Sequence, residues 1–401
     1  MRRAALGLRG RRGARVLGAA RARRSLHVAV VGGGVVGVST ADELLRRGCE
    51  VTLLEATQEV AGVSSATWGN AGTLWKSLRG TTPSDPATLW RTLKLLGRDP
   101  GHEKNVFVHN GCLADASFYR WALALARAQN PAAYDWETAH GDAQRYLLER
   151  AAALDAGGLR VAGGEVRSAG GAVVSSDAGD ALGDSALYTQ ALAADCKARG
   201  MHVWTNAPAE AVHGRGVTVD GARVDADAVV LCAGARAASL LPFYVPIHPL
   251  RGYSITARVT DVALAPKASF FVDPEHLYCT RLDEERVRFT CYGEFVPLRK
   301  TPPTKVLETR LKNLIEYAVP EASEWSDYRE CAVWHGDRPL TPDGLPLVGK
   351  LAPGLYINAG HGFNGWRDAG ITAQRVAALI AGGDVDAPAY VEAWAPARFN
   401  L

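Results

Sequence analysis

The sequence predicts an α/β fold in which a domain built on a parallel sheet is joined to a second, α+β domain with an antiparallel sheet. A strand, a glycine turn, a helix and a second strand follow one another within residues 27–55. A further strand, glycine loop and helix occupy residues 354–382. Between these blocks, residues 247–295 hold segments rich in β-branched and aromatic residues, which are typical of antiparallel strands.

The first block is a β-α-β unit whose turn carries a glycine pattern. HVAVV at 27–31 leads into GGGVVG at 32–37, and EVTLLE at 50–55 forms the second strand. Parallel strands joined in this way need a crossover helix, which we predict from Val35 to Arg47. The first glycine allows a tight turn, the second lets backbone N–H groups approach a pyrophosphate, and the third permits close helix packing. The unit predicts a dinucleotide site at the helix N-terminus.

Glu55 ends the second strand and carries the next signal of this site. A carboxylate there accepts hydrogen bonds from the hydroxyls of an adenosine ribose and repels a 2′-phosphate, so NADP is disfavoured. The alternative is a glycine turn that binds no ligand, followed by a surface glutamate.

Three loops extend the pattern beyond the first unit. SSATWGNAG at 64–72 is rich in hydroxyls and glycine, so it is suited to bind a pyrophosphate and to approach a flat ring; an ordinary NAD site does not need it. LPLVG at 345–349 and NAGHGFNGW at 358–366 lie near the end of the chain. Taken alone, each could be an ordinary polar loop.

The remaining chain supplies the other expected elements. Residues 151–184 show little pattern. Helices are expected near 86–96, 118–127 and 186–199, and strands at HVWTNA (202–207), VTVDG (217–221), DADAVVLCAG (225–234), YSITARV (253–259), HLYCTRL (276–282) and RVRFTCYGEF (286–295).

The first 24 residues differ in composition from the rest of the chain. They hold nine arginines and no acidic residue, scattered among Ala, Leu and Val without a continuous apolar run. This composition is typical of a mitochondrial transit peptide; a basic tail or a nucleic-acid-binding arm is the alternative. Without these arginines, 36 basic residues face 42 acidic ones, so we expect no nucleic-acid partner. No run of 18 apolar residues predicts a membrane span.

The seven cysteines are widely spaced and include no C-x-x-C pair. They predict buried free thiols, with neither a zinc site nor a disulfide framework, and no metal site is expected.

These motifs together resemble the FAD-dependent D-amino acid dehydrogenase and glycine oxidase family, over nearly the whole chain after residue 27. GDRPLTPDGLPLVG with NAGHGFNGWRDAG is the most specific part; PLRGYSITA resembles the entry to the family's substrate sheet. The resemblance implies a discontinuous Rossmann-like FAD-binding domain and an α+β substrate domain. The expected ranges are a transit peptide at 1–24, FAD-binding segments at 25–107, 185–245 and 333–401, and substrate-domain segments at 108–184 and 246–332.

The motifs and the resemblance place a set of residues around the cofactor. Val212 would bind adenine through its backbone, and the loop that opens the last helix would present N–H groups to the flavin edge that gains negative charge. Related enzymes that hold FAD covalently carry histidine where Gly69 stands, so FAD is expected to be non-covalent. The expected cofactor-binding residues are Gly32, Gly34, Val35, Val36, Gly37, Glu55, Ser64, Ser65, Asn70, Ala71, Gly72, Val212, Gly234, Gly360, His361, Gly362, Phe363 and Asn364.

Arg338 is the principal substrate-site candidate, because the family has an arginine at this place that binds the substrate carboxylate. Arg251 and Tyr253 are secondary candidates that share one strand face, and Arg251 could instead be structural. His361 and His335 are possible general bases. Hydride transfer from a neutral amine to flavin needs no base, so both could equally be structural.

The resulting expectation is oxidation of the C–N bond of a small amino acid to an imine that hydrolyses to keto acid and ammonia. Oxygen, a quinone or a flavoprotein would accept the electrons. Two alternatives stay open: oxidation of a secondary amine such as N-methylglycine or proline, and a catalytically idle FAD-binding assembly factor.

Overall fold

The computed structural model describes residues 25–74, 105–127, 134–154, 159–161, 164–168, 173–177, 179–273, 275–299, 301–382 and 388–401. The expected transit peptide and the expected helix at 86–96 lie outside these residues.

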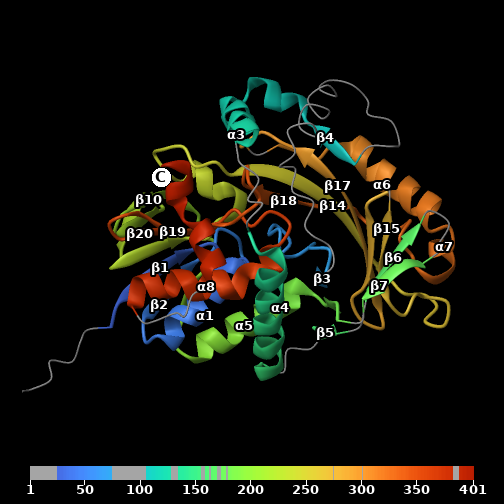
Figure 1. Cartoon of the computed structure of the whole chain (residues 1–401), viewed down its shortest axis with the longest axis horizontal. Coiled ribbons are helices and arrows are strands. Elements are labelled where there is room, and N and C mark those ends of the chain that lie inside the picture. The colour runs from blue at the N-terminus through green and yellow to red at the C-terminus, as the bar shows by residue number, and fades with distance from the viewer. Residues whose placement is uncertain are drawn as a thin grey trace, which may run out of the picture.

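A six-stranded sheet forms the centre of the first domain (Figure 1). Its central strand β1 pairs in parallel with β2 on one side and β13 on the other, as the β-α-β pattern predicts. Strands of this kind are buried on both faces and are therefore apolar throughout. In sheet order the strands are β19 (Leu347–Ala352), β20 (Leu355–Ala359), β13 (Ala228–Leu231), β1 (His27–Val31), β2 (Glu50–Leu54) and β9 (His202–Trp204).

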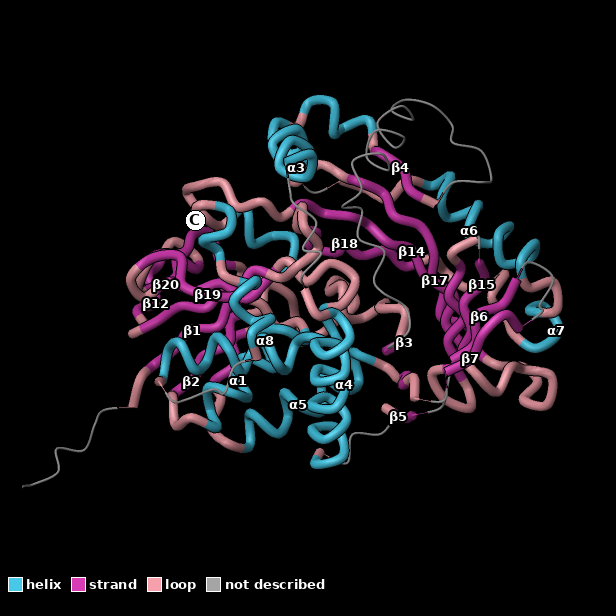
Figure 2. The backbone as a smooth tube through the Cα atoms, viewed as in Figure 1, coloured by secondary structure: helices cyan, strands magenta, loops and turns pink. Residues whose placement is uncertain are grey.

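Helices cover one face of this sheet and a small sheet covers the other. The helices, which gather on one side in Figure 2, are α1 (Val35–Arg46), α4 (Trp136–Ala153), α5 (Ser185–Ala198) and α8 (Gly365–Ala381). The small antiparallel sheet comprises β10 (Ala209–His213), β11 (Gly216–Val219) and β12 (Ala222–Asp225). It packs Val212 and Val217 against Val229 and Ile357 of the central sheet.

The helix α4 comes from the range that the sequence assigned to the substrate domain, yet it packs on the helices of the first domain. Its Tyr146 ring lies over Gly370 of α8, where an added Cβ would stand 2.1 Å from the ring. The Tyr146 hydroxyl donates to Glu43 Oε1 on α1 at 2.5 Å.

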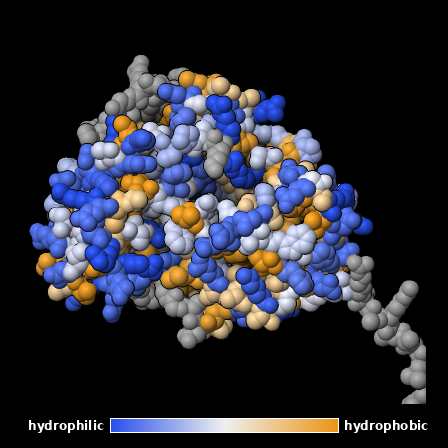
Figure 3. Space-filling view, turned by 180° about the vertical axis from the view of Figure 1, so that it is seen from behind, coloured by the Kyte–Doolittle hydropathy of each residue, from blue (hydrophilic) through white to orange (hydrophobic). Residues whose placement is uncertain are grey.

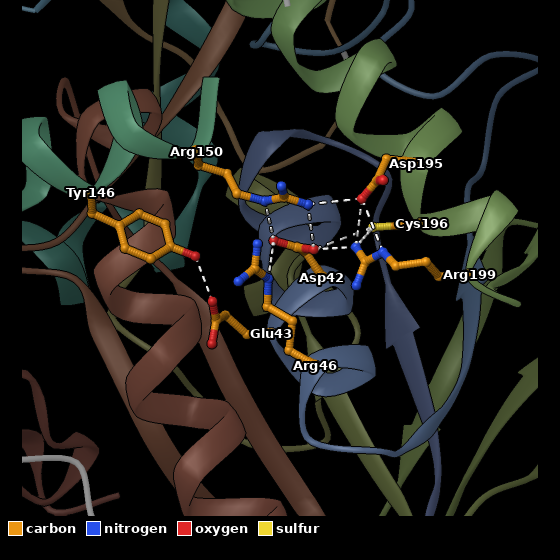
Figure 4. Close-up of polar contacts among 8 residues, drawn as sticks. All are labelled: Asp42, Glu43, Arg46, Tyr146, Arg150, Asp195, Cys196 and Arg199. Atoms are coloured by element: carbon orange, nitrogen blue, oxygen red, sulfur yellow. Dashed lines mark hydrogen bonds and ion pairs between the residues drawn. The ribbon is translucent and has the colours of Figure 1, made fainter. Parts of the chain in front are cut away.

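A cluster of charges fastens α4 to α1 and α5 (Figure 4). Asp42 on α1 is 1% exposed, and Arg150 of α4 donates to both of its carboxylate oxygens at 2.9 and 3.0 Å. Arg199, just after α5, also bonds to Asp42, and Arg150 reaches Asp195 at 2.8 Å. Burial raises the pKa of Asp42, but the hydrogen bond from Arg150 and the charges of Arg150, Arg46 and Arg199 outweigh it, so the pKa lies below its usual value.

The second domain is an eight-stranded, mainly antiparallel sheet. Its strands, in sheet order, are β18 (Trp334–Leu340), β14 (His248–Arg258), β17 (Arg286–Phe295), β16 (Leu277–Arg281), β15 (Ser269–Asp273), β6 (Gly164–Ser168) and β7 (Val173–Asp177), with β4 (Val106–Val108) beside β17. On its outer face, α6 (Lys305–Ala318) and α7 (Ala322–Trp325) share a core with Phe289, which stacks on Trp325 at 5.9 Å between ring centroids.

Strand pairing differs from the expected ranges at two points. The ranges placed β18 and the first two residues of β4 with the cofactor segments, whereas β4 pairs with β17 and β18 pairs with β14. Both strands join the antiparallel sheet because their backbone partners lie there; the domain ranges as a whole stay a prediction. Residues 151–184, which show little pattern, contribute β6 and β7.

Three short strands and a further helix complete the described elements. The strands β3 (Thr73–Leu74), β8 (Ala181–Leu182) and β5 (Arg160–Val161) form a small sheet, and α3 spans Ala116–Arg127. None of the described helices is both long and apolar enough to cross a lipid bilayer. On the face seen in Figure 3, hydrophobic residues are scattered among hydrophilic ones.

Candidate active site

A cavity of about 1830 Å3 lies between the two sheets. Its walls come from the turn between β1 and α1, the loop at 63–71, the end of β13, one face of the antiparallel sheet and the loop before α8. Loops at the carboxyl ends of parallel strands are the usual ligand-binding edge of such a sheet.

The glycine turn forms one end of the cavity. Gly32 has φ +112°, and a Cβ there would stand 2.6 Å from the carbonyl oxygen of Cys232. A Cβ on Gly37 would stand 1.8 Å from the carbonyl oxygen of Gly32, so this glycine lets α1 approach the turn. Gly34 lines the cavity with Val35 and Val36, whereas Gly37 does not.

Glu55 lines the same end and is held by its neighbours. Its Oε2 accepts from the backbone N–H of Gly33 at 2.7 Å, and its Oε1 accepts from the backbone N–H and hydroxyl of Thr57, both at 2.8 Å. The carboxylate is thus held in a fixed position on the cavity wall, and its binding of ribose hydroxyls stays a prediction.

The loop at 63–71 brings Ser64, Ser65, Asn70 and Ala71 to the cavity. Gly72 does not line it. With φ +80°, Gly72 turns the chain where a Cβ would stand 2.8 Å from the carbonyl oxygen of Gly183.

Gly69 packs against Trp334 of β18. A Cβ on Gly69 would stand 2.0 Å from Trp334 Cε3, and the indole Nε1 donates to the carbonyl oxygen of Val63 at 2.7 Å. The indole occupies the space that any side chain at position 69 would need, so a histidine does not fit here.

Val212 lies away from the cavity, while Gly234 lines it with φ +53°. The Val212 side chain is buried in the small sheet, and its N–H points to the carbonyl oxygen of Leu240 at 3.4 Å. Pro208 and Ala209 line the cavity at this point instead. The backbone contact expected between Val212 and adenine stays a prediction.

The loop before α8 closes the cavity opposite the glycine turn. His361, Gly362, Phe363 and Asn364 line it, and Gly360, with φ +82°, makes the turn without lining it. His361 Nε2 lies 3.0 Å from the hydroxyl of Thr372, which itself donates to the carbonyl of Asp368. The Nε2 therefore donates. Burial lowers the pKa of His361 to about 4, so the ring is neutral at pH 7.

Besides Thr290 and Thr301, three cavity-lining residues near the start of α8 that are missing from the sequence prediction carry buried polar atoms without a hydrogen-bond partner among the described residues. They are Asn358 (Oδ1), Trp366 (Nε1) and Arg367 (Nη2). Buried polar atoms are normally paired, so these point to a polar ligand at the start of α8. Asn358 and Trp366 lie within the recognised NAGHGFNGW motif, which was the available signal. These unpaired atoms, with the glycine turn at 32–37 and the fixed Glu55, fit a dinucleotide cofactor.

Arg338 faces this cavity from β18. Its guanidinium covers Gly252 of β14, where an added Cβ would stand 2.4 Å from Arg338 Cζ. Its Nη1 donates to the carbonyl of Tyr292 at 3.1 Å, and its Cζ lies 5.2 Å from the Phe363 ring centroid. No acidic side chain in the described part of the chain pairs with it.

Arg251 and Tyr253 project from the opposite face of the sheet. Arg251 opposes Asp337 in the ladder, whereas Arg338 opposes Leu250, and successive side chains alternate between faces. Arg251 Nε donates to Asp337 Oδ1 at 2.9 Å, and the Tyr253 hydroxyl donates to Glu294 Oε2 at 2.6 Å. The two share a face, as predicted, but it is not the face of Arg338. Arg251 nevertheless lines the cavity, whereas Tyr253 does not, and a substrate role for either stays a prediction.

His335 lies on that second face as well, opposite Tyr253 in the ladder. Burial and the charge of Arg251 lower its pKa. Both His335 and His361 line the cavity that Arg338 faces, and a general-base role for either stays a prediction.

The one group of acidic and thiol side chains with metal-ligand spacing in the described ranges is Asp42, Asp195 and Cys196. Arg150 and Arg199 already bind both carboxylates. The cluster is an ion-pair network that joins helices.

The chain is similar to characterised proteins over most of its length. It is 29% identical to a D-amino acid dehydrogenase of Rhizobium johnstonii, covering 90% of this chain and 98% of the relative. It is 31% identical to a D-amino acid dehydrogenase of Methylobacterium nodulans, covering 89% and 96%.

Two solved structures share the fold. Glycine oxidase from Geobacillus kaustophilus superposes with a TM-score of 0.68 at 17% identity, covering 93% of this chain and 99% of that one. L-proline dehydrogenase from P. horikoshii gives 0.65 at 17% identity, covering 94% and 98%. The profile of the FAD dependent oxidoreductase family matches residues 27–379. The chain therefore belongs to the family of FAD-dependent oxidoreductases.

Proposed function

We propose that this enzyme oxidises the C–N bond of a small amino acid to an imine, which water converts to a keto acid and ammonia. The observation that carries the proposal is Arg338, a cation without a carboxylate partner in the described residues, on the cavity wall beside Phe363. The curated relatives named D-amino acid dehydrogenase support the substrate class.

Arg338 is prepared to bind a carboxylate. The hydrogen bond from its Nη1 to Tyr292 and the Phe363 ring restrain the guanidinium plane. A planar guanidinium takes both oxygens of a carboxylate through parallel hydrogen bonds, which fixes direction as well as position. The substrate α-carbon is then held at a constant place within the cavity, and positioning alone supplies much of the rate.

The chemistry that FAD supplies when bound is acceptance of the hydride released from the α-carbon. The residues of this chain bind and orient the amine, and a neutral amine needs no general base. The loop before α8 presents the N-terminal end of that helix to the cavity, where developing negative charge is stabilised.

An anaerobic titration of the purified flavoprotein tests the activity directly. A panel of amino acids, both enantiomers of each, with N-methylglycine, proline and simple amines, should contain at least one compound that bleaches the flavin absorbance. Bleaching by secondary amines alone would indicate a secondary amine, in place of a primary amino acid, as the substrate. If nothing in the panel bleaches the flavin, the protein is an FAD-binding scaffold and the proposal is wrong.

Replacement of Arg338 tests the carboxylate role. Arg338→Lys keeps the charge but loses the pair of parallel N–H donors, so it should turn over slowly with normal flavin content. Arg338→Ala loses two charge-assisted hydrogen bonds of about 1.5–3 kcal/mol each, so kcat/KM should fall by roughly a hundredfold or more. Amines without a carboxylate are the control and should be nearly unaffected. Near-normal kcat/KM in the alanine variant would remove Arg338 from the substrate site.

We further propose that FAD is held without a covalent bond, because Trp334 fills the space beside Gly69. Acid precipitation should release the yellow chromophore into the supernatant, where absorbance measures it. Flavin that stays with the pellet would contradict this proposal.

A further inference from the structure

One cross-strand row of the antiparallel sheet runs beneath the cavity next to Arg338. Ser254 of β14 stands directly opposite Trp334 of β18 and opposite Thr290 of β17, and Tyr278 of β16 stands opposite Thr290. Directly opposed residues project their side chains from the same face. Gly252, which the Arg338 guanidinium covers, lies two positions before Ser254 and shares its face. Thr290 therefore projects from the same face as Arg338.

Among the described residues, the hydroxyl of Thr290 has no hydrogen-bond partner. Thr290 is 3% exposed and lines the cavity, and its Oγ1 makes no hydrogen bond within the described part of the chain. An unpaired buried hydroxyl costs free energy, whereas one that meets a ligand group does not. Thr280, on the same face of β16, is also buried and unpaired but does not line the cavity. Thr290 and Thr280 therefore differ in whether the hydroxyl lies where a ligand in the cavity can reach it.

Strand geometry places the two groups at a separation that suits one small molecule. Ser254 is roughly 7 Å along β14 from Gly252, and Thr290 is about 5 Å across from Ser254. The guanidinium above Gly252 and the Thr290 hydroxyl therefore border the same part of the cavity. In an α-amino acid, the amino group is attached to the carbon next to the carboxylate, so a carboxylate on Arg338 puts that amino group near the arginine.

We propose that Thr290 is a substrate-binding residue whose hydroxyl oxygen accepts a hydrogen bond from the substrate amino group. The inference rests on the proposed function, since it assumes a carboxylate on Arg338. One contact leaves the substrate free to turn about its carboxylate; a second, at the amino group, stops that rotation. Together the two contacts select α-amino acids over simple carboxylic acids and fix the direction of the α C–H bond.

Thr290→Val removes the hydroxyl and keeps the branched shape. We expect kcat/KM for the best amino acid substrate to fall about ten- to a hundredfold, the loss of one hydrogen bond to a charged or strongly polar group. The matching carboxylic acid without an amino group, followed by its perturbation of the flavin spectrum, should bind with an unchanged Kd. Thr290→Ser, which keeps the hydroxyl, should restore most of the activity. Thr280→Val is the matched control and should change neither quantity.

Each other outcome overturns the assignment. Unchanged kcat/KM in Thr290→Val would exclude the contact, and an equal loss for the carboxylic acid would assign the hydroxyl to the carboxylate. Loss of bound flavin in Thr290→Val but not in Thr280→Val would assign it to the cofactor. If no amino acid or amine bleaches the wild-type flavin, the proposed function itself fails, which is distinct from a failure confined to the Thr290 variant.

Discussion

The contact between Gly69 and Trp334 gives a stability prediction that can be worked from the structure. In Gly69→Ala the new methyl group would lie 2.0 Å from Trp334 Cε3, whereas carbon atoms in contact are about 3.5–4.0 Å apart. The indole has to move by roughly 1.5 Å or more, which strains the packing by about 1–3 kcal/mol. Its hydrogen bond to the Val63 carbonyl, worth about 1 kcal/mol, would be lost as well.

A double-mutant cycle isolates this clash. Urea unfolding of wild type, Gly69→Ala, Trp334→Ala and the double variant, each with bound flavin measured, gives the coupling free energy. Because Trp334→Ala removes both the obstructing ring and its hydrogen bond, Gly69→Ala should cost little in that background, with a coupling of about 2–4 kcal/mol. Additive effects, or a Gly69→Ala variant as stable as wild type, would refute the argument that the indole excludes a side chain at this position.

Two further predictions concern the ion-pair network around Asp42 and the expected transit peptide at residues 1–24. Asp42→Asn should lower the free energy of unfolding at pH 7 by about 3 kcal/mol, since it removes the buried carboxylate that Arg150, with a side chain only 10% exposed, binds. The pKa of Asp42 is below its usual value, so its stabilisation is present above about pH 4 and is lost on further acidification. In urea titrations, the difference in unfolding free energy between variant and wild type should therefore shrink below that pH. A difference that stays constant with pH would contradict this. Residues 1–30 fused to a fluorescent reporter should direct it to mitochondria, and a diffuse cytosolic or nuclear signal would count against the targeting proposal.

Local patterns predicted much of the fold because the forces behind them are local. The helix predicted from Val35 to Arg47 is α1, at Val35–Arg46, and the strand at HVAVV is β1. A buried parallel strand must be apolar throughout, and the glycines of the turn are required by backbone contacts within the same unit. The low-pattern region at 151–184 gave no such signal, yet part of it pairs with β15 in the antiparallel sheet.

The sequence placed part of the candidate site, and what it left open has a common cause. Alternation along β14 correctly placed Arg251 and Tyr253 on one face, but no local pattern tells whether Arg338 shares that face. The ladder between β14 and β18 decides it, because Arg338 opposes Leu250. The backbone contact expected for Val212 stays a prediction, and Val212 itself does not line the cavity.

The sequence by itself determined the α/β class, the dinucleotide turn, Glu55 and the terminal glycine loop, since each depends on residues that are neighbours in the chain. Only the tertiary structure decided which side chains share the cavity. It placed Trp334 over Gly69, set Arg251 and Arg338 on opposite faces of the sheet, and brought the Thr290 hydroxyl, unpaired among the described residues, to the cavity. These relations depend on strand register and domain packing, in which long-range contacts fix positions that local preference leaves open.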